Sequence, residues 1–141
     1  MRVVLDANVL ISAVLSSRGT SADLLRATRD GAFELIVSAL LLAELRRAFT
    51  YPKLQQRVSP ESSAAFIGWL REHAVLAEDP ATPPPVHSPD PDDDYLLALA
   101  IGQRAFLVTG DQHLLGLRDD FPILPAAEFL RKLQTDQDRL R

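Results

Sequence analysis

The sequence of 141 residues contains no cysteine. Disulfide bonds, zinc–thiolate sites and cysteine nucleophiles are therefore excluded. The sequence also lacks an apolar run approaching the ~20 residues that span a bilayer. Asp6 and Asn8 interrupt the apolar N-terminal segment, which only superficially resembles a signal peptide. We therefore expect a cytoplasmic protein with no membrane attachment.

Lysine and net positive charge are also scarce. Only Lys53 and Lys132 are lysines among the fifteen basic residues, and the formal net charge is −4. No global positive field therefore indicates nucleic-acid binding. The other basic residues are arginines, whose guanidinium suits forked contacts with phosphate, although a GC-rich genome produces the same bias. The hydrophobic share of 47% and the charged share of 24% are ordinary for a soluble globular protein.

Short apolar runs alternate with helical patterns along the chain. We predict strands at 3–5, 33–37, 74–76, 106–109 and 123–124. We predict helices at 9–15, 22–30, 39–49, 60–73, 92–103 and 125–133. This alternation predicts one doubly wound α/β domain over residues 1–133 with a central, mainly parallel sheet. Residues 134–141 are predicted to be a polar, frayed C-terminal tail.

Two carboxylates follow predicted strands. Asp6 comes directly after the apolar run Val3–Leu5, and Asp111 follows the strand at 106–109. Taken alone, each is also explained as a turn or cap residue. A buried carboxylate is costly unless a cation or a hydrogen-bond donor meets it. The carboxyl edge of a parallel sheet is also where ligands bind.

A third carboxylate, Glu44, lies in the helix predicted at 39–49. Its neighbours three and four residues away are Leu40, Leu41 and Ala48. Glu44 therefore falls on the apolar stripe, and we expect it to be drawn inward. The alternative is a surface ion pair with Arg47.

Four acids stand in the five-residue run Asp90–Asp94. Helix capping accounts for one or two of them, and four repel one another once the chain folds. The helical spacing to the apolar residues at 96, 97 and 100 directs Asp93 towards the sheet. We expect Asp92 and Asp94 to face water.

Parallel topology brings these carboxylates to one rim of the sheet. Without compensation, some of the four would be forced to stay protonated. A hard divalent cation removes this conflict, and carboxylate and water ligands suit Mg²⁺ or Mn²⁺. Such ions typically serve phosphate chemistry.

The sequence resembles PIN-domain proteins, of the kind found as VapC-like toxins in bacterial and archaeal toxin–antitoxin pairs. The matching segments fall in family order over residues 3–115 and read VVLDANVLISA, SALLLAELRRAF, DPDDDYLLALA and FLVTGDQHLL. The resemblance implies a three-layer α/β/α PIN-like nuclease domain at 1–133. It also implies a Mg²⁺- or Mn²⁺-dependent endoribonuclease, usually a homodimer, with RNA as substrate and a cognate antitoxin protein as a possible partner.

The resemblance also assigns residues by motif. The catalytic and metal-binding acids it implies are Asp6, Glu44, Asp93 and Asp111, and the acidic run leaves Asp92 open as the third acid. The polar motif positions that orient ligands or substrate are Asn8, Ser38 and Thr109. The candidates for contacts with RNA phosphates are Arg46, Arg47, Lys53 and Arg57, for which a solvated helix end is at least as good an explanation.

The mechanism we predict is in-line attack on an RNA phosphodiester by a water that one or two metal ions activate. The main rival is a PIN-like protein that binds RNA or a partner without cutting it. The four acids argue against this rival, because a binding module has no need of an uncompensated acidic cluster. Response-regulator receivers need a lysine near their acidic pocket, and haloacid dehalogenase-type phosphatases need an acid where Asn8 stands.

Overall fold

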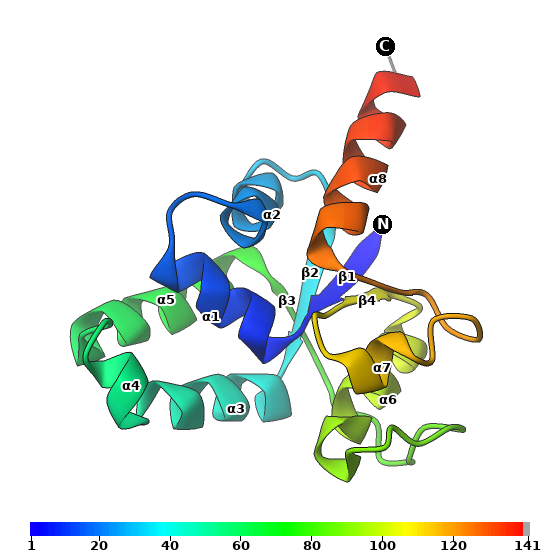
Figure 1. Ribbon diagram of the computed structural model, residues 1–141, viewed down its shortest axis with the longest axis horizontal. Helices are drawn as coiled ribbons and strands as arrows, with labels where there is room; N and C mark the ends of the chain where they lie inside the picture. The colour runs from blue at the N-terminus through cyan, green and yellow to red at the C-terminus, as the bar shows by residue number, and fades with distance from the viewer. Residues whose placement is uncertain (140–141) are drawn as a thin grey trace.

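The centre of the computed structural model, which describes residues 1–139, is a parallel sheet of five strands (Figure 1). In the order β3-β2-β1-β4-β5, its members are β3 (Val75–Ala77), β2 (Glu34–Ser38), β1 (Arg2–Leu5), β4 (Phe106–Val108) and β5 (Ile123–Leu124). The apolar residues Val3, Val4 and Leu5 of the central strand β1 are fully buried. This burial is typical of a parallel strand covered on both faces.

Helices cover both faces of this sheet (Figure 1). They are α1 (Ala7–Leu15), α2 (Thr20–Arg29), α3 (Ala39–Phe49), α4 (Pro52–Gln55), α5 (Pro60–His73), the 3-10 helix η1 (Pro91–Asp93), α6 (Asp94–Gln103), α7 (Gln112–Leu115) and α8 (Ala126–Arg139). The chain steps from β1 to β2 to β3 through α1–α5 and returns to β4 through α6. Right-handed crossovers therefore place α6 on the face opposite to α1, α2, α3 and α5. The predicted three-layer α/β/α domain is confirmed.

The helix starts follow from local capping chemistry. The Ser38 hydroxyl accepts the Leu41 N–H at 3.3 Å, and the Ser59 hydroxyl accepts the Ser62 N–H at 3.1 Å ahead of Pro60. Such side-chain caps satisfy backbone donors that have no partner within the helix. The Ser38 cap fixes the direction in which α3 leaves the sheet. The Ser59 cap fixes the direction in which α5 leaves the preceding loop.

Some boundaries differ from the predictions. Helices α4 and α7 were not predicted, because four residues are too few to show a helical period. Helix α8 continues to Arg139, so the part of the predicted frayed tail at 134–139 is helical. The pair between Lys132 and Asp136, 4.0 Å apart, supports this extension one turn along the helix. The last two positions of the predicted tail, 140–141, lie outside the described residues.

Helix α8 is held to the domain by an aromatic side chain. Phe129 is fully buried, and its ring meets Phe33 edge-on at 5.5 Å and Phe106 at 5.9 Å. Aromatic pairs of this kind add stabilisation beyond the apolar area that they bury. Within residues 1–139, no helix is long and apolar enough to cross a membrane.

We predict that Phe129→Ala lowers the free energy of unfolding by about 3–5 kcal/mol, because it leaves a cavity between α8 and the sheet. Urea denaturation of the wild type and the variant measures this change. Gln134→Ala, an exposed position on the same helix, is the control and should change stability by less than about 0.5 kcal/mol. Equal stability of the two variants would contradict the packing of α8 described above.

Candidate active site

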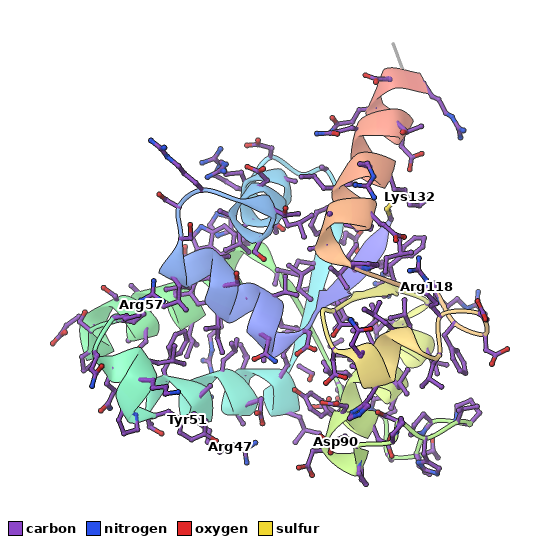
Figure 2. All side chains as sticks on the ribbon, viewed as in Figure 1. Arg47, Tyr51, Arg57, Asp90, Arg118 and Lys132 are labelled. Carbon is purple, nitrogen blue, oxygen red and sulfur yellow. The ribbon has the colours of Figure 1, made fainter. Side chains whose placement is uncertain are left out.

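A polar cleft of about 540 Å³ lies at the carboxyl edge of the sheet, between the end of β1, the first turns of α3 and the start of α6. Figure 2 shows Arg47 of α3 and Asp90 ahead of α6 at this part of the molecule. The acids that line the cleft are Asp6, Glu44, Asp90, Asp92 and Asp93. Among the described residues that line the cleft, Arg47 is the only basic one.

Asp6 is the most deeply placed of these acids, with 6% of its surface exposed. It is the N-cap of α1, and its Oδ1 accepts the Asn8 N–H at 3.4 Å. Its Oδ2 accepts the hydroxyl of the fully buried Thr109 at 2.7 Å. The Thr109 oxygen in turn accepts the Asp111 N–H at 3.0 Å. Thr109 therefore ties Asp6 to Asp111 across the β1–β4 pair.

Asp111 itself does not line the cleft but stands beside it. Its Oδ1 accepts the His113 N–H at 2.7 Å, which caps the short helix α7. Burial is the main cause of the raised pKa of Asp6 and of Asp93, and the Asp111 charge raises both further. Asp6, Asp93 and Asp111 therefore form one electrostatically coupled group.

Among the acids that line the cleft, Asp93 has a buried carboxylate oxygen, Oδ2, that is not satisfied by a hydrogen bond within the described residues. Burial, followed by repulsion from Asp111 and Asp6, raises the pKa of Asp93 to about 6. Asp92 is exposed to solvent. The structure thus brings Asp93, the residue favoured from helical spacing, next to Asp6 and Asp111.

Glu44 combines the two behaviours considered for it. It lines the cleft from the second turn of α3, and its carboxylate also pairs with Arg47. Its side chain is 35% exposed, so it is drawn towards the cleft without being buried. Any ligand at Glu44 competes with the Arg47 guanidinium.

The polar motif residues take different positions. Asn8 is exposed and lines the cleft, where its side chain is free to meet a ligand. Ser38 is fully buried and caps α3, so it positions the helix that carries Glu44. Thr109 positions Asp6 and Asp111.

The expectation that Asp94 faces water is wrong. Its carboxylate accepts the Ser88 N–H at 2.8 Å and pairs with His87 Nδ1 at 2.7 Å, and its side chain is 20% exposed. Hydrogen bonding to His87 lowers the pKa of Asp94. Asp94 thereby attaches the proline-rich segment before η1 to the start of α6. The spacing of apolar residues along α6 could not predict these contacts, because His87 and Ser88 lie in the loop before the helix.

Sequence reasoning did not single out Asp90 or Tyr95, which also line the cleft. The Asp90 carboxylate accepts the Asp92 N–H at 3.0 Å, a capping role that its sequence position indicates equally well. Burial and the nearby Glu44 charge raise the pKa of the Tyr95 phenol, which keeps it a neutral hydrogen-bond donor at the cleft. The sequence could have indicated Tyr95 as a cleft residue, because it lies between Asp93 and the apolar Leu96 at the start of the helix.

The four basic candidates do not form one surface. Arg47 lines the acidic cleft, whereas Arg46 lines a different groove between α3 and α5. Lys53 is exposed on α4. Arg57 donates to the Leu15 carbonyl at 3.4 Å, and Figure 2 shows it far from Arg47.

The donor set of the cleft fits a hard divalent cation. Carboxylate oxygens are the ligands that Mg²⁺ and Mn²⁺ prefer, and the buried Oδ2 of Asp93 lacks a donor in the described chain. In residues 1–139, however, no three acidic or histidine side chains are already placed to hold one ion. Simultaneous ligation of one ion by three of these side chains would therefore require some of them to rotate, whereas one or two carboxylates with waters also suit Mg²⁺.

The fold and the acidic cleft define an α/β/α domain with a clustered-carboxylate site. The family model of the PIN domain matches residues 2–113, and the chain belongs to the PIN domain family. It is 26% identical over 138 residues to the uncharacterized protein MJ1680 of Methanocaldococcus jannaschii, covering 98% of this chain and 88% of that protein.

Solved structures of other proteins share the fold. A chain of VapBC2 from Rickettsia felis, solved bound to a DNA fragment from their promoter, matches with a TM-score of 0.59 and 16% identity. That match covers 88% of this chain and 97% of the other. PAE2754 from Pyrobaculum aerophilum matches with a TM-score of 0.65 and 15% identity, covering 96% of this chain and 90% of the other.

The raised pKa of Asp93 predicts a specific pH dependence of stability. Because this pKa is about 6 when folded and 3.8 ordinarily, the folded state binds more protons between these values. The free energy of unfolding therefore falls as the pH rises through this window and remains lowered above it. We expect Asp93→Asn to be more stable than wild type at neutral pH by about 1–2 kcal/mol, a value reduced for partial exposure.

Urea denaturation at a series of pH values checks this prediction. The difference between Asp93→Asn and wild type should shrink as the pH falls from about 6 and vanish well below 3.8, where the carboxyl is neutral in both states. Asp120→Asn, an exposed acid beyond α7, is the control for loss of one negative charge. A stability difference that does not depend on pH would contradict the shifted pKa.

Proposed function

We propose that this PIN-domain protein is a metal-dependent endoribonuclease that hydrolyses RNA phosphodiester bonds. The observation that carries the proposal is the clustering of Asp6, Asp93 and Asp111 at the sheet edge, where neither Asp6 nor Asp93 makes an ion pair within the described residues and Asp111 has only His113 Nδ1 at 3.8 Å. Membership of the PIN domain family supports it, because PIN domains are typically nucleases.

In the proposed reaction, Asp6, Glu44, Asp93 and Asp111 would hold one or two Mg²⁺ or Mn²⁺ ions. When bound, the metal supplies a more acidic water and neutralises charge on the phosphate. Thr109 keeps Asp6 and Asp111 in place through its two hydrogen bonds. The Asn8 amide and the Tyr95 phenol, both lining the cleft, offer neutral donors to phosphate oxygens.

Arg47 has a distinct part in this proposal. It pairs with Glu44 at the cleft, and its guanidinium can form forked contacts with a phosphate. Transfer of Arg47 from Glu44 to an RNA phosphate releases the Glu44 carboxylate as a ligand. Arg46, Lys53 and Arg57 are not needed for this arrangement.

The wider setting is part of the same proposal. We infer that the chain acts in the cytoplasm as a homodimer and is the toxin of a toxin–antitoxin pair. The structural likeness to a chain of VapBC2 supports an antitoxin protein as partner. The nuclease domain is assigned to 1–133, and the end of α8 extends beyond it.

One observation favours a second candidate, a PIN domain that binds RNA or a partner without cleavage. The described side chains do not present three ligands to one ion in this conformation, and Glu44 is occupied by Arg47. A cleavage assay distinguishes these two candidates. It detects a catalytic site that assembles only when metal binds, and it gives no product if the site never assembles.

We predict that the wild type cleaves a mixed RNA substrate with Mg²⁺ or Mn²⁺ and does not cleave it with chelator. Asp6→Asn and Asp93→Asn should each lower turnover by roughly a hundredfold or more, because each removes a charged ligand of the metal. Asp92→Asn should lower it far less. Cleavage rates from gel-resolved fragments, with circular dichroism to verify folding, measure these effects.

The exposed variant Asp120→Asn is the matched control and should retain wild-type turnover. Retained cleavage in folded Asp6→Asn or Asp93→Asn would overturn the assignment of the site. Absence of cleavage in the wild type across both metals, together with RNA binding, would favour the non-catalytic candidate.

A further inference from the structure

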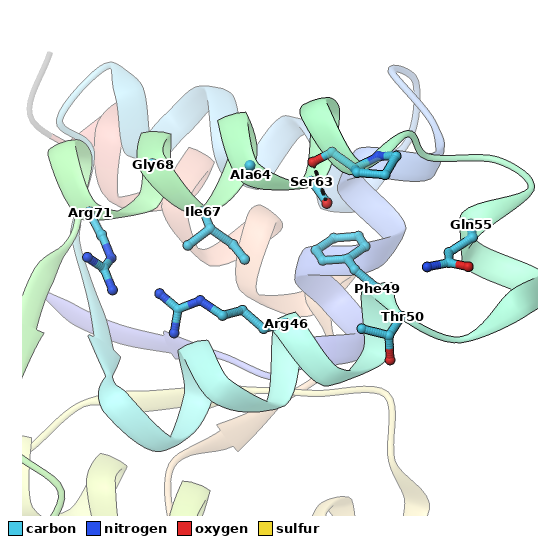
Figure 3. Close-up of a pocket in the computed structure, with 10 residues that line it drawn as sticks. Arg46, Phe49, Thr50, Gln55, Ser63, Ala64, Ile67, Gly68 and Arg71 are labelled. Carbon is cyan, nitrogen blue, oxygen red and sulfur yellow. Dashed lines mark hydrogen bonds between the residues drawn. The ribbon is translucent and has the colours of Figure 1, made fainter.

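A second concave surface lies between α3 and α5, apart from the acidic cleft (Figure 3). This α3–α5 groove has a volume of about 440 Å³. Its apolar lining includes Phe49 of α3 and Ala64, Ile67 and Gly68 of α5. A groove walled by two packed helices suits an amphipathic helix laid along it.

The charged lining of the α3–α5 groove is entirely basic. Figure 3 shows the side chains of Arg46 and Arg71 extending from opposite helices into the same space. Within residues 1–139, neither guanidinium makes an ion pair or a side-chain hydrogen bond, and no acid lines the groove. Elsewhere the chain pairs Arg2 with Glu34 and Arg118 with Glu128. Two converging, unneutralised cations favour an anionic occupant.

Gly68 leaves part of the wall of the α3–α5 groove without a side chain. It lies in the middle of the 14-residue helix α5, where glycine is among the least favourable residues. A Cβ added at Gly68 would meet no atom within 4 Å. No contact inside the described chain therefore requires a glycine here, and its effect is to keep the wall of the groove open.

The groove is better suited to protein than to RNA. Single-stranded nucleic acids use exposed aromatic faces on which bases stack, but the aromatic ring in the groove, Phe49, is 7% exposed. Apolar side chains with flanking carboxylates match the apolar wall and the two arginines. A second copy of the same surface would bring like charges together and is disfavoured.

We propose that the α3–α5 groove binds an acidic amphipathic helical segment of a partner protein. Its apolar side chains cover Ala64 and Gly68, the accessible part of the wall, and the exposed edge of Ile67. Its Asp or Glu side chains pair with Arg46 and Arg71. This proposal does not depend on the nuclease activity, because it uses residues outside the acidic cleft.

The test is a selection from a displayed library of helical peptides of about four turns. The apolar stripe is varied among Leu, Ile, Met and Ala, and the flanking positions carry Glu, Lys or Gln in equal shares. The full chain is the target, and Gly68→Leu, which fills the groove, is used to remove peptides that bind elsewhere. Thermal unfolding verifies that Gly68→Leu is folded.

We expect the retained peptides to be enriched in Glu over Lys at the flanking positions. A retained peptide should shift the backbone amide NMR signals of groove residues such as Thr50, Ala64 and Arg71. Arg46→Glu combined with Arg71→Glu should weaken its binding by roughly tenfold or more. The same double variant should bind the Lys-for-Glu version of the peptide more tightly than the original.

Arg131→Glu, an exposed charge reversal on α8, is the control and should leave peptide binding unchanged. The proposal is overturned if no peptides depend on Gly68, or if Lys is enriched as strongly as Glu. It is also overturned if a single-stranded RNA oligonucleotide shifts the groove signals and displaces the peptide, since the groove would then belong to nucleic acid. RNA cleavage is not a readout of this experiment, so failure of either proposal is recognised separately.

Discussion

The hydrogen bond from the Thr109 hydroxyl to Asp6 Oδ2, 2.7 Å long, is the contact on which the site depends most directly. It joins the end of β1 to the end of β4, and the same hydroxyl oxygen accepts the Asp111 N–H. Since Thr109 is fully buried, the geometry of both acids is set by the interior of the domain. A buried carboxylate is tolerated there because a donor meets it.

The acids nevertheless remain in electrostatic conflict. Burial raises the pKa of Asp6 and Asp93, and Asp111 adds to both effects. The domain keeps this cluster although it lowers stability at neutral pH. Such a local cost is typical of functional sites. In the proposed function, these acids would hold a divalent cation that offsets their repulsion, and Glu44 would join them as a ligand by rotating away from Arg47.

Much of this arrangement could be predicted from the sequence. The apolar run before Asp6 and the spacing of Asp93 to the core of α6 both indicate their final positions, because burial follows regular strand and helix periods. The Thr109–Asp6 contact has no local signal, since it requires the pairing of β4 with β1. The contacts of Asp94 and the extension of α8 depend on tertiary packing and ion pairing that a period of apolar residues does not report.

The most direct test of the central claim is calorimetric titration of the chain with Mn²⁺. The account predicts binding by the wild type, binding weakened by roughly tenfold or more in Asp93→Asn, and wild-type binding in the exposed variant Asp120→Asn. Binding of equal strength in all three proteins, or none in the wild type, would contradict the claim that the coupled carboxylates form a metal site.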